Sequence, residues 1–108
     1  MNRNRIVINS VDRIDMISYA EIMYIQSSGK YTTFVTSNKR RVTSSSNIGS
    51  HYLPDHLFIR VHNSYVVNIN FILYIQKGEN WNIILMDSTS IPVSRRKRDE
   101  LTAFIMNS

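Results

Sequence analysis

The chain has 108 residues and carries 13 Lys and Arg against 8 Asp and Glu, a formal net charge of +5. With 43% hydrophobic and 19% charged residues, this composition excludes an intrinsically disordered chain, and the length fits a single domain. The absence of cysteine excludes a disulfide framework, a thiolate zinc site and a cysteine nucleophile. No segment suits a signal peptide or a membrane-spanning helix, so we expect a soluble, cytoplasmic protein whose charge favours polyanions such as nucleic acid or an anionic membrane face.

Residue usage favours strands, because Ile, Val, Tyr, Phe and Thr make up 39 of the 108 residues, whereas Leu and Ala make up only 7. In the N-terminal half, runs of these residues between turn residues predict five short strands. They cover 4–10, 13–18, 21–27, 31–37 and 40–44. The first two strands, and the next two around Gly29, are close enough to form hairpins. Serines 44–46 predict a cap for a short helix over 47–53, which Pro54 closes.

The C-terminal half continues the pattern, with further strands predicted over 57–61, 71–76, 81–86 and 90–93. Because several of these runs are almost continuously apolar, both of their faces need cover, which favours stacked sheets or a partly closed barrel. The clearest helix is predicted last, over 95–107. Its apolar residues Leu101, Phe104 and Ile105 recur at helical spacing, and Ser94 is placed to cap it.

The start of that last helix is basic, with four positive side chains at 95–98 beside the positive end of the helix dipole. Each costs about 0.3 to 1 kcal/mol there. One interpretation is a solvated face on which Asp99 and Glu100 offset Arg95 and Arg96. The other is a phosphate clamp, in which one arginine could also reach a guanine edge. A second basic cluster, 39–41, lies at a predicted hairpin turn and is typical of solvent-facing positions.

The three histidines do not predict a metal site, because His51, His56 and His62 are separated by five and six residues and no cysteine assists them. Asp55 is adjacent to His56, but neighbours on a strand point to opposite sides and no nucleophile motif occurs. The isolated glycines form neither a Rossmann fingerprint nor a P-loop. We therefore expect neither an enzyme nor a cofactor.

The segment 58–68, FIRVHNSYVVN, is the most informative, because polar residues interrupt an otherwise apolar strand. From the residues alone it predicts a tight corner held by Asn and Ser side chains that bond to the backbone. The segment also closely resembles the signature of LytTR DNA-binding domains, the output modules of LytR/AlgR-type bacterial response regulators. Residues 21–27 (EIMYIQS) and 91–96 (IPVSRR) are similar to two further motifs of that family, in the same order.

The resemblance covers nearly the whole chain, so we interpret residues 1–108 as one LytTR-like domain that contains no receiver domain. It implies a mostly β fold of stacked small antiparallel sheets, with about ten short strands and one or two short helices. It also implies sequence-specific binding of double-stranded DNA in bacterial transcription regulation, with loops entering successive major grooves. The expected partners are DNA with repeated sites, a second copy of the domain on that DNA, and a receiver domain elsewhere in the full-length protein.

Carried over residue by residue, the resemblance predicts base contacts from Asn63, Arg95 and Thr32. Arginine suits the O6 and N7 atoms of guanine, and asparagine suits the N6 and N7 atoms of adenine. The predicted contacts to the DNA backbone are Lys30, Tyr31, Arg41, His62, Ser64, Arg96 and Lys97.

Three alternatives remain open from the residues. A basic β-barrel could bind single-stranded nucleic acid by stacking bases on Tyr31, Tyr52 and Trp81. A protein-interaction module could add a partner strand at an open sheet edge. A hydrolase could use His62 or His56.

Overall fold

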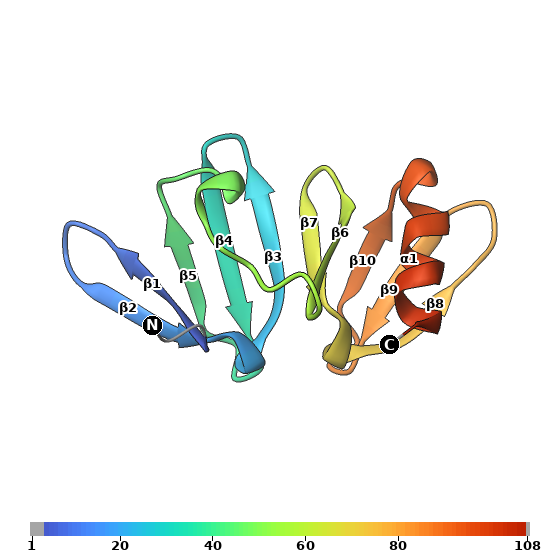
Figure 1. The fold of residues 1–108 in the computed structure, drawn as a ribbon, viewed down its shortest axis with the longest axis horizontal. Coiled ribbons are helices and arrows are strands. Elements are labelled where there is room, and N and C mark those ends of the chain that lie inside the picture. The colour runs from blue at the N-terminus through green and yellow to red at the C-terminus, as the bar shows by residue number, and fades with distance from the viewer. Residues whose placement is uncertain (1–3, 108) are drawn as a thin grey trace.

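The computed structural model describes residues 4–107, which form ten strands, four short 3-10 turns and one α-helix (Figure 1). The strands are β1 (Arg5–Asn9), β2 (Ile14–Ser18), β3 (Ile22–Ser28), β4 (Tyr31–Thr36), β5 (Arg41–Ser44), β6 (Phe58–His62), β7 (Tyr65–Asn68), β8 (Ile72–Gln76), β9 (Trp81–Leu85) and β10 (Ser90–Val93). The 3-10 turns are η1 (Tyr19–Glu21), η2 (Ile48–Ser50), η3 (Ile69–Phe71) and η4 (Arg95–Lys97), and the helix is α1 (Arg98–Met106).

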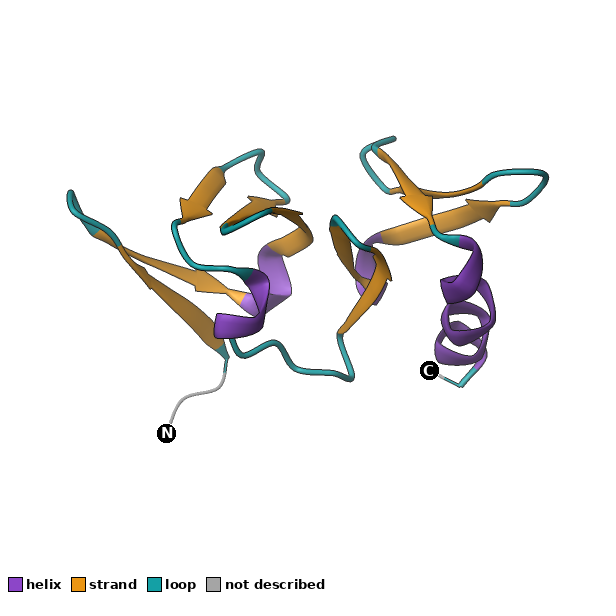
Figure 2. Cartoon of the chain, turned by 90° about the horizontal axis from the view of Figure 1, so that it is seen from above, coloured by secondary structure: helices purple, strands orange, loops and turns teal. Residues whose placement is uncertain are grey.

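The strands form three antiparallel sheets, as the fold prediction expected. β1 pairs with β2, the central sheet has the order β5-β4-β3-β7-β6, and the last sheet has the order β10-β9-β8. Figure 2 shows the sheets in a row, with the β1–β2 hairpin at one end and α1 at the other. The molecule is therefore elongated, with extents of 44 × 27 × 23 Å. The sheets do not close into the partly closed barrel that was the other expectation.

Two hydrophobic cores lie against the central sheet. One core joins Tyr24, Val35 and Val67 to the last sheet and to Leu101 of α1. The other joins Ile25 of β3 and Phe34 of β4 to the β1–β2 hairpin. Ile25 directly follows Tyr24, and Phe34 directly precedes Val35. Because successive side chains of a strand point to opposite faces, β3 and β4 serve both cores. Because both faces of these strands are buried, their sequences are almost continuously apolar.

The predicted helix over 47–53 is wrong in extent. Only η2 is helical, and the backbone returns to an extended conformation at His51 (φ −109°, ψ 136°). Ser44 does not cap a helix, because its hydroxyl accepts a hydrogen bond from the Ser46 N–H at 3.1 Å. Serine hydroxyl groups and asparagine amide groups that form local hydrogen bonds compete with helix formation, which explains why the turn is short.

The last helix is confirmed with a change at its start. Leu101 is fully buried and Phe104 and Ile105 pack against the same core, as the spacing predicted. However, Arg95–Lys97 form η4 ahead of α1, so of the four basic residues only Lys97, the N-cap, and Arg98 lie at the start of the α1 dipole. Ser94 is the N-cap residue of η4, but its hydroxyl makes no capping bond and is buried without a partner among residues 4–107. Its backbone N–H instead donates to Val61 O at 2.9 Å.

The described part of the chain contains no helix of the length and apolarity that crossing a membrane requires.

Candidate nucleic-acid interface

Three segments that the sequence singled out lie along one edge of the molecule. They are the β3–β4 loop, the β6–β7 loop and η4, which together form the upper edge in Figure 1. Antiparallel pairing produces this arrangement, because Gln26 near the end of β3 is opposite Tyr65 at the start of β7. Two backbone hydrogen bonds connect the segments: Ser27 N–H donates to Ser64 O at 2.8 Å, and Ser94 N–H donates to Val61 O at 2.9 Å.

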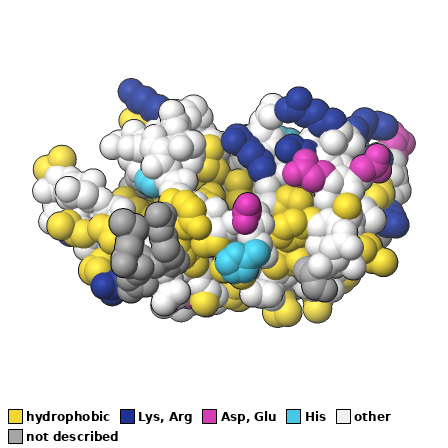
Figure 3. Space-filling model, viewed as in Figure 1, with side chains coloured by type: hydrophobic (Ala, Val, Ile, Leu, Met, Phe, Trp, Pro, Cys, Tyr) yellow, Lys and Arg dark blue, Asp and Glu magenta, His cyan; other side chains and the backbone are white. Residues whose placement is uncertain are grey.

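Positive side chains gather along the same edge, where Figure 3 shows Lys and Arg in dark blue. Lys30 and Tyr31 are exposed at the β3–β4 loop, and Arg95 and Arg96 are exposed at η4. Lys97 is half-buried and pairs with Glu100 at 3.3 Å. The solvated-face interpretation would pair Arg95 and Arg96 with Asp99 and Glu100, but Glu100 instead pairs with Lys97, and Arg96 donates to Asn63.

Asn63 stands at the tip of the β6–β7 loop with an exposed side chain. The loop is the predicted corner, but a histidine holds it: Ser64 N–H donates to Nδ1 of His62 at 3.1 Å. Arg60 donates from Nη2 to the Asn63 carbonyl and from Nε to the His62 carbonyl. Arg96 donates from Nη2 to Oδ1 of Asn63 at 3.2 Å, which connects this loop to η4.

The prediction for Thr32 needs correction. Its side chain is fully buried, and its hydroxyl donates to Ser46 O at 2.8 Å. Thr32 and Tyr31 are neighbours on β4 and point to opposite faces, so Thr32 is buried while Tyr31, 48% exposed, faces solvent. The ammonium group of Lys30 lies 5.8 Å from the centre of the Tyr31 ring. Lys30 and Tyr31 are therefore the side chains that this loop offers to a ligand.

The structure does not bring Arg41 together with the other candidates. Arg41 begins β5 opposite Val35, whereas the other end of β5, Ser44, is opposite Thr32 beside the β3–β4 loop. It lines a cavity of about 260 Å³ together with Lys39 and Asp87, away from the candidate edge.

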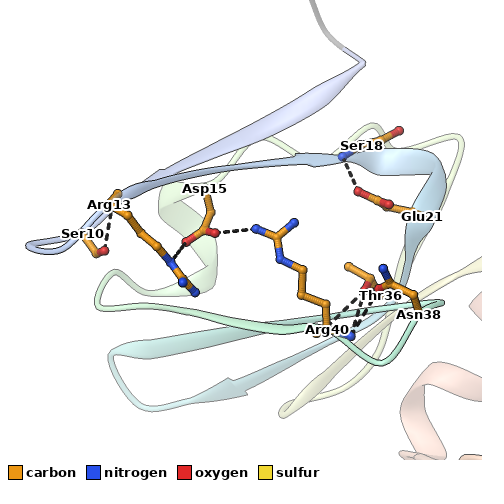
Figure 4. A network of polar contacts seen from close by, with 8 residues as sticks. All are labelled: Ser10, Arg13, Asp15, Ser18, Glu21, Thr36, Asn38 and Arg40. Carbon is orange, nitrogen blue, oxygen red and sulfur yellow. Dashed lines mark hydrogen bonds and ion pairs between the residues drawn. The ribbon is translucent and has the colours of Figure 1, made fainter.

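The neighbouring basic residues form ion pairs within the chain. Figure 4 shows Arg40 of the β4–β5 turn donating to Asp15 of β2, which also pairs with Arg13 at 3.0 Å. Burial alone would raise the pKa of Asp15, but the hydrogen bonds from Arg40 and Arg13 outweigh it and hold the pKa below its ordinary value. These contacts fasten the β1–β2 hairpin to the central sheet.

Lys39 connects the central sheet to the last sheet, because its ammonium group lies 3.1 Å from Oδ2 of Asp87 in the β9–β10 turn. Burial raises the pKa of Asp87, but hydrogen bonds from Thr89 and Lys39 outweigh that effect and leave the pKa below its ordinary value. The 39–41 cluster therefore includes two residues, Lys39 and Arg40, that form ion pairs with other elements of the fold.

The histidines have separate neighbours. His51 packs edge-on against Phe34, with Nε2 3.0 Å from the Ser44 hydroxyl, and burial lowers the pKa of His51. His62 belongs to the β6–β7 loop, and His56 lies beside α1. Among residues 4–107, no group of three His, Asp or Glu side chains is placed to hold a metal ion.

The aromatic residues of the single-strand alternative are also apart. Tyr31 and Tyr52 are about half exposed. Trp81 is partly covered, with Nζ of Lys77 5.2 Å and the guanidinium of Arg98 5.0 Å from its ring. A continuous stacking surface would need exposed rings along one groove, which these positions do not provide.

Arg60 of β6 was not among the predicted DNA contacts, yet it supports the β6–β7 loop. Its alternation signal was present, because Ile59 and Val61 are buried and place Arg60 on the exposed face of β6. The strand pattern gives the face, but it does not give the hydrogen bonds of Arg60 to the loop carbonyls.

Comparison with known proteins identifies the family. The family model described as the LytTr DNA-binding domain matches residues 12–106. Among solved structures, the chain is similar to a LytTr DNA-binding domain from Bacillus cereus, with a TM-score of 0.81 and 19% identity over 96% of this chain and 98% of that one. This likeness confirms the fold.

Curated relatives are similar as well. The sensory transduction protein LytT of Bacillus subtilis is 51% identical over 51 residues, 45% of this chain and 21% of the relative. LytT of Bacillus cereus is 32% identical over 83% of this chain and 38% of its own length. The heme-containing CO-sensing transcriptional regulator RcoM 2 of Paraburkholderia xenovorans is 30% identical over 82% of this chain and 35% of its own length.

The chain thus spans between a fifth and two fifths of the length of these relatives. The family model, by contrast, matches nearly all of the chain, and the three sheets have the arrangement of a solved member. The chain belongs to the LytTr DNA-binding domain family.

Proposed function

We propose that this domain binds double-stranded DNA sequence-specifically in bacterial transcription regulation, with its loops in successive major grooves. The observation that carries the proposal is the single edge on which the β3–β4 loop, the β6–β7 loop and η4 lie together with exposed Arg, Asn and Lys side chains. One turn of B-DNA rises about 34 to 36 Å. The long axis of the domain is 44 Å, so the edge is long enough to face two major grooves on one side of a duplex.

In this proposal, Asn63 and Arg95 read bases, because both side chains are exposed at the edge and carry the donors and acceptors that purine edges match. Lys30, Tyr31, Ser64, Arg96 and Lys97 contact the DNA backbone. His62 contributes in a specific way: since Nδ1 accepts from Ser64 N–H, Nε2 carries the remaining ring proton and can donate to a phosphate oxygen.

We also propose that the signal reaches this domain from another part of the full-length protein. The matched regions are 21 to 38% of the lengths of the curated relatives, and the names of these relatives describe sensory transduction or CO sensing. A receiver domain of a two-component system is the input that the sequence resemblance implies. Repeated half-sites occupied by two copies of the domain are part of the same proposal.

The proposal is tested by selecting binding sites from a randomised duplex library and sequencing them. We expect enrichment of a short repeated motif, and we expect Asn63→Ala and Arg95→Ala each to relax the preference at defined base pairs, by about 1 to 3 kcal/mol. Arg5→Ala is the matched control, because Arg5 is an exposed arginine on β1, away from the edge. It should leave the motif unchanged.

Retention of single strands in preference to duplexes, or binding that depends on salt but not on sequence, would contradict the proposal. The first result would favour the single-strand alternative. The second would leave a basic domain with only backbone contacts.

A further inference from the structure

The hydrogen bond between Arg96 and Asn63 joins two segments that are far apart in the sequence. Arg96 lies in η4 and Asn63 at the tip of the β6–β7 loop, 33 positions apart, and both are exposed at the candidate edge. Nη2 of Arg96 lies 3.2 Å from Oδ1 of Asn63. An exposed arginine whose only task is to meet phosphates needs no partner in the protein, so this contact calls for another explanation.

The chemistry of arginine fixes which amide atom faces it. A guanidinium group has five N–H donors and no acceptor, so it bonds to the oxygen of an Asn side chain and repels the NH₂ group. The contact therefore selects one of the two orientations of the Asn63 amide. Within residues 4–107, Nδ2 of Asn63 has no hydrogen-bond partner, so both of its N–H groups remain available to a ligand.

The backbone beneath the amide is fixed separately. Arg60 holds the Asn63 carbonyl, His62 accepts from Ser64 N–H at 3.1 Å, and Ser27 N–H donates to Ser64 O at 2.8 Å. With the loop held at these points, rotation of the Asn63 side chain is the main freedom left at its tip. Arg96 restricts that rotation.

We propose that Arg96 is a specificity-determining positioning residue that sets the amide of Asn63 for base readout, in addition to any phosphate contact. The inference rests on the proposed function. Adenine readout requires Oδ1 to accept from N6 and Nδ2 to donate to N7. Oδ1 has two lone pairs, so it can accept from Arg96 and from N6 together. Preorganising the side chain lowers the entropy that readout must offset.

The test is a double-mutant cycle on the selected duplex and on the duplex changed at the one base pair whose preference Asn63→Ala relaxes. We expect the wild type to prefer the selected base by about tenfold or more. Arg96→Ala should reduce that preference by about 3- to 10-fold, and in the Asn63→Ala background it should reduce it no further. Lys97→Ala is the control, and it should weaken binding to both duplexes equally.

A measurement on the free domain tests the contact without DNA. ¹⁵N relaxation of the Asn63 side-chain amide should show restricted motion in the wild type and, in Arg96→Ala, motion as free as that of the exposed Asn80 amide. Unchanged thermal melting would show that Arg96→Ala is folded.

The outcomes separate the two proposals. If the wild type has a sequence preference but Arg96→Ala weakens both duplexes equally and independently of Asn63→Ala, Arg96 is a phosphate contact and this inference is overturned. If the wild type has no sequence preference, the proposed function fails and this inference fails with it.

Discussion

Replacing Asn68 by alanine should destabilise the domain more than any exposed substitution, because its buried side chain connects three elements. Its amide donates to Ile22 O at 3.0 Å and to Tyr19 O at 3.4 Å, and its oxygen accepts from Asn70 N–H at 2.9 Å. The side chain is fully buried. Removing it leaves polar backbone groups of η1, β3 and η3 without this partner.

Each buried group left without a partner costs about 1 to 3 kcal/mol. With two well-formed bonds lost, we expect Asn68→Ala to lower the free energy of unfolding by about 2 to 4 kcal/mol, a large part of the roughly 5 to 15 kcal/mol of an ordinary domain. For a chain of this size, this corresponds to a Tm lower by about 8 to 16 °C. Urea unfolding followed by the fluorescence of Trp81, the single tryptophan, measures the change.

Two variants separate hydrogen bonding from loss of volume. Asn68→Asp keeps the size and the acceptor for Asn70 N–H, but it replaces the donor by an oxygen that faces two carbonyl oxygens, so it should be at least as destabilising as Asn68→Ala. Asn70→Ala changes only an exposed side chain and should stay within about 0.5 kcal/mol of the wild type. If Asn68→Asp were as stable as the wild type while Asn68→Ala was destabilised, the hydrogen-bond argument would be refuted, and the cavity left by the smaller side chain would explain the loss.

Further predictions concern the hairpins and pH. Because the pKa of Asp15 is lower in the folded state, the unfolded chain binds protons more readily, so the free energy of unfolding should fall as the pH drops below about 3.9. The fall should be less steep in Asp15→Asn. Urea unfolding at several pH values measures both. Thr32→Val should leave the selected DNA motif unchanged, because Thr32 is buried, whereas Tyr31→Ala should weaken DNA binding. A change of motif in Thr32→Val but not in Tyr31→Ala would contradict this reasoning. Gly78→Ala should lower Tm more than Gly29→Ala. Gly29 (φ +59°) has the left-handed conformation, which alanine adopts at a cost of about 1 to 2 kcal/mol, whereas Gly78 (φ +144°) lies outside it. Equal losses of Tm would refute this.

The strands were largely predictable because turn residues marked their ends. The glycine at position 29 has φ +59°, the conformation that a tight β3–β4 connection requires, and the residues beside it are exposed while both strands become buried away from the turn. Strand β7 was not predicted separately, because the polar residues before it indicated a corner without giving the length of the strand that follows. Local signals predict turns better than they predict which segment pairs with which.

The exposure of the candidate site residues was predictable where chain order fixed the register and not where packing decided it. Asn63 and Arg95 are exposed at the expected edge, since each lies two positions after a buried strand residue, Val61 and Val93 respectively. Thr32 differs because its burial depends on Ser46, fourteen positions away, whose carbonyl accepts its hydroxyl proton. The contact between Arg96 and Asn63 joins two separate segments, so no sequence spacing could have indicated it.

The central sheet shared by two cores has a consequence for how the domain unfolds. Tyr24 and Ile25 are neighbours in β3 but belong to different cores. The same is true of Val66 and Val67 in β7. Loosening either core would bring water onto an apolar face of strands that the other core still holds, which disfavours a half-folded state. The domain should therefore melt in one cooperative transition. Until that transition, the spacing between the β3–β4 loop, the β6–β7 loop and η4 should vary little with temperature.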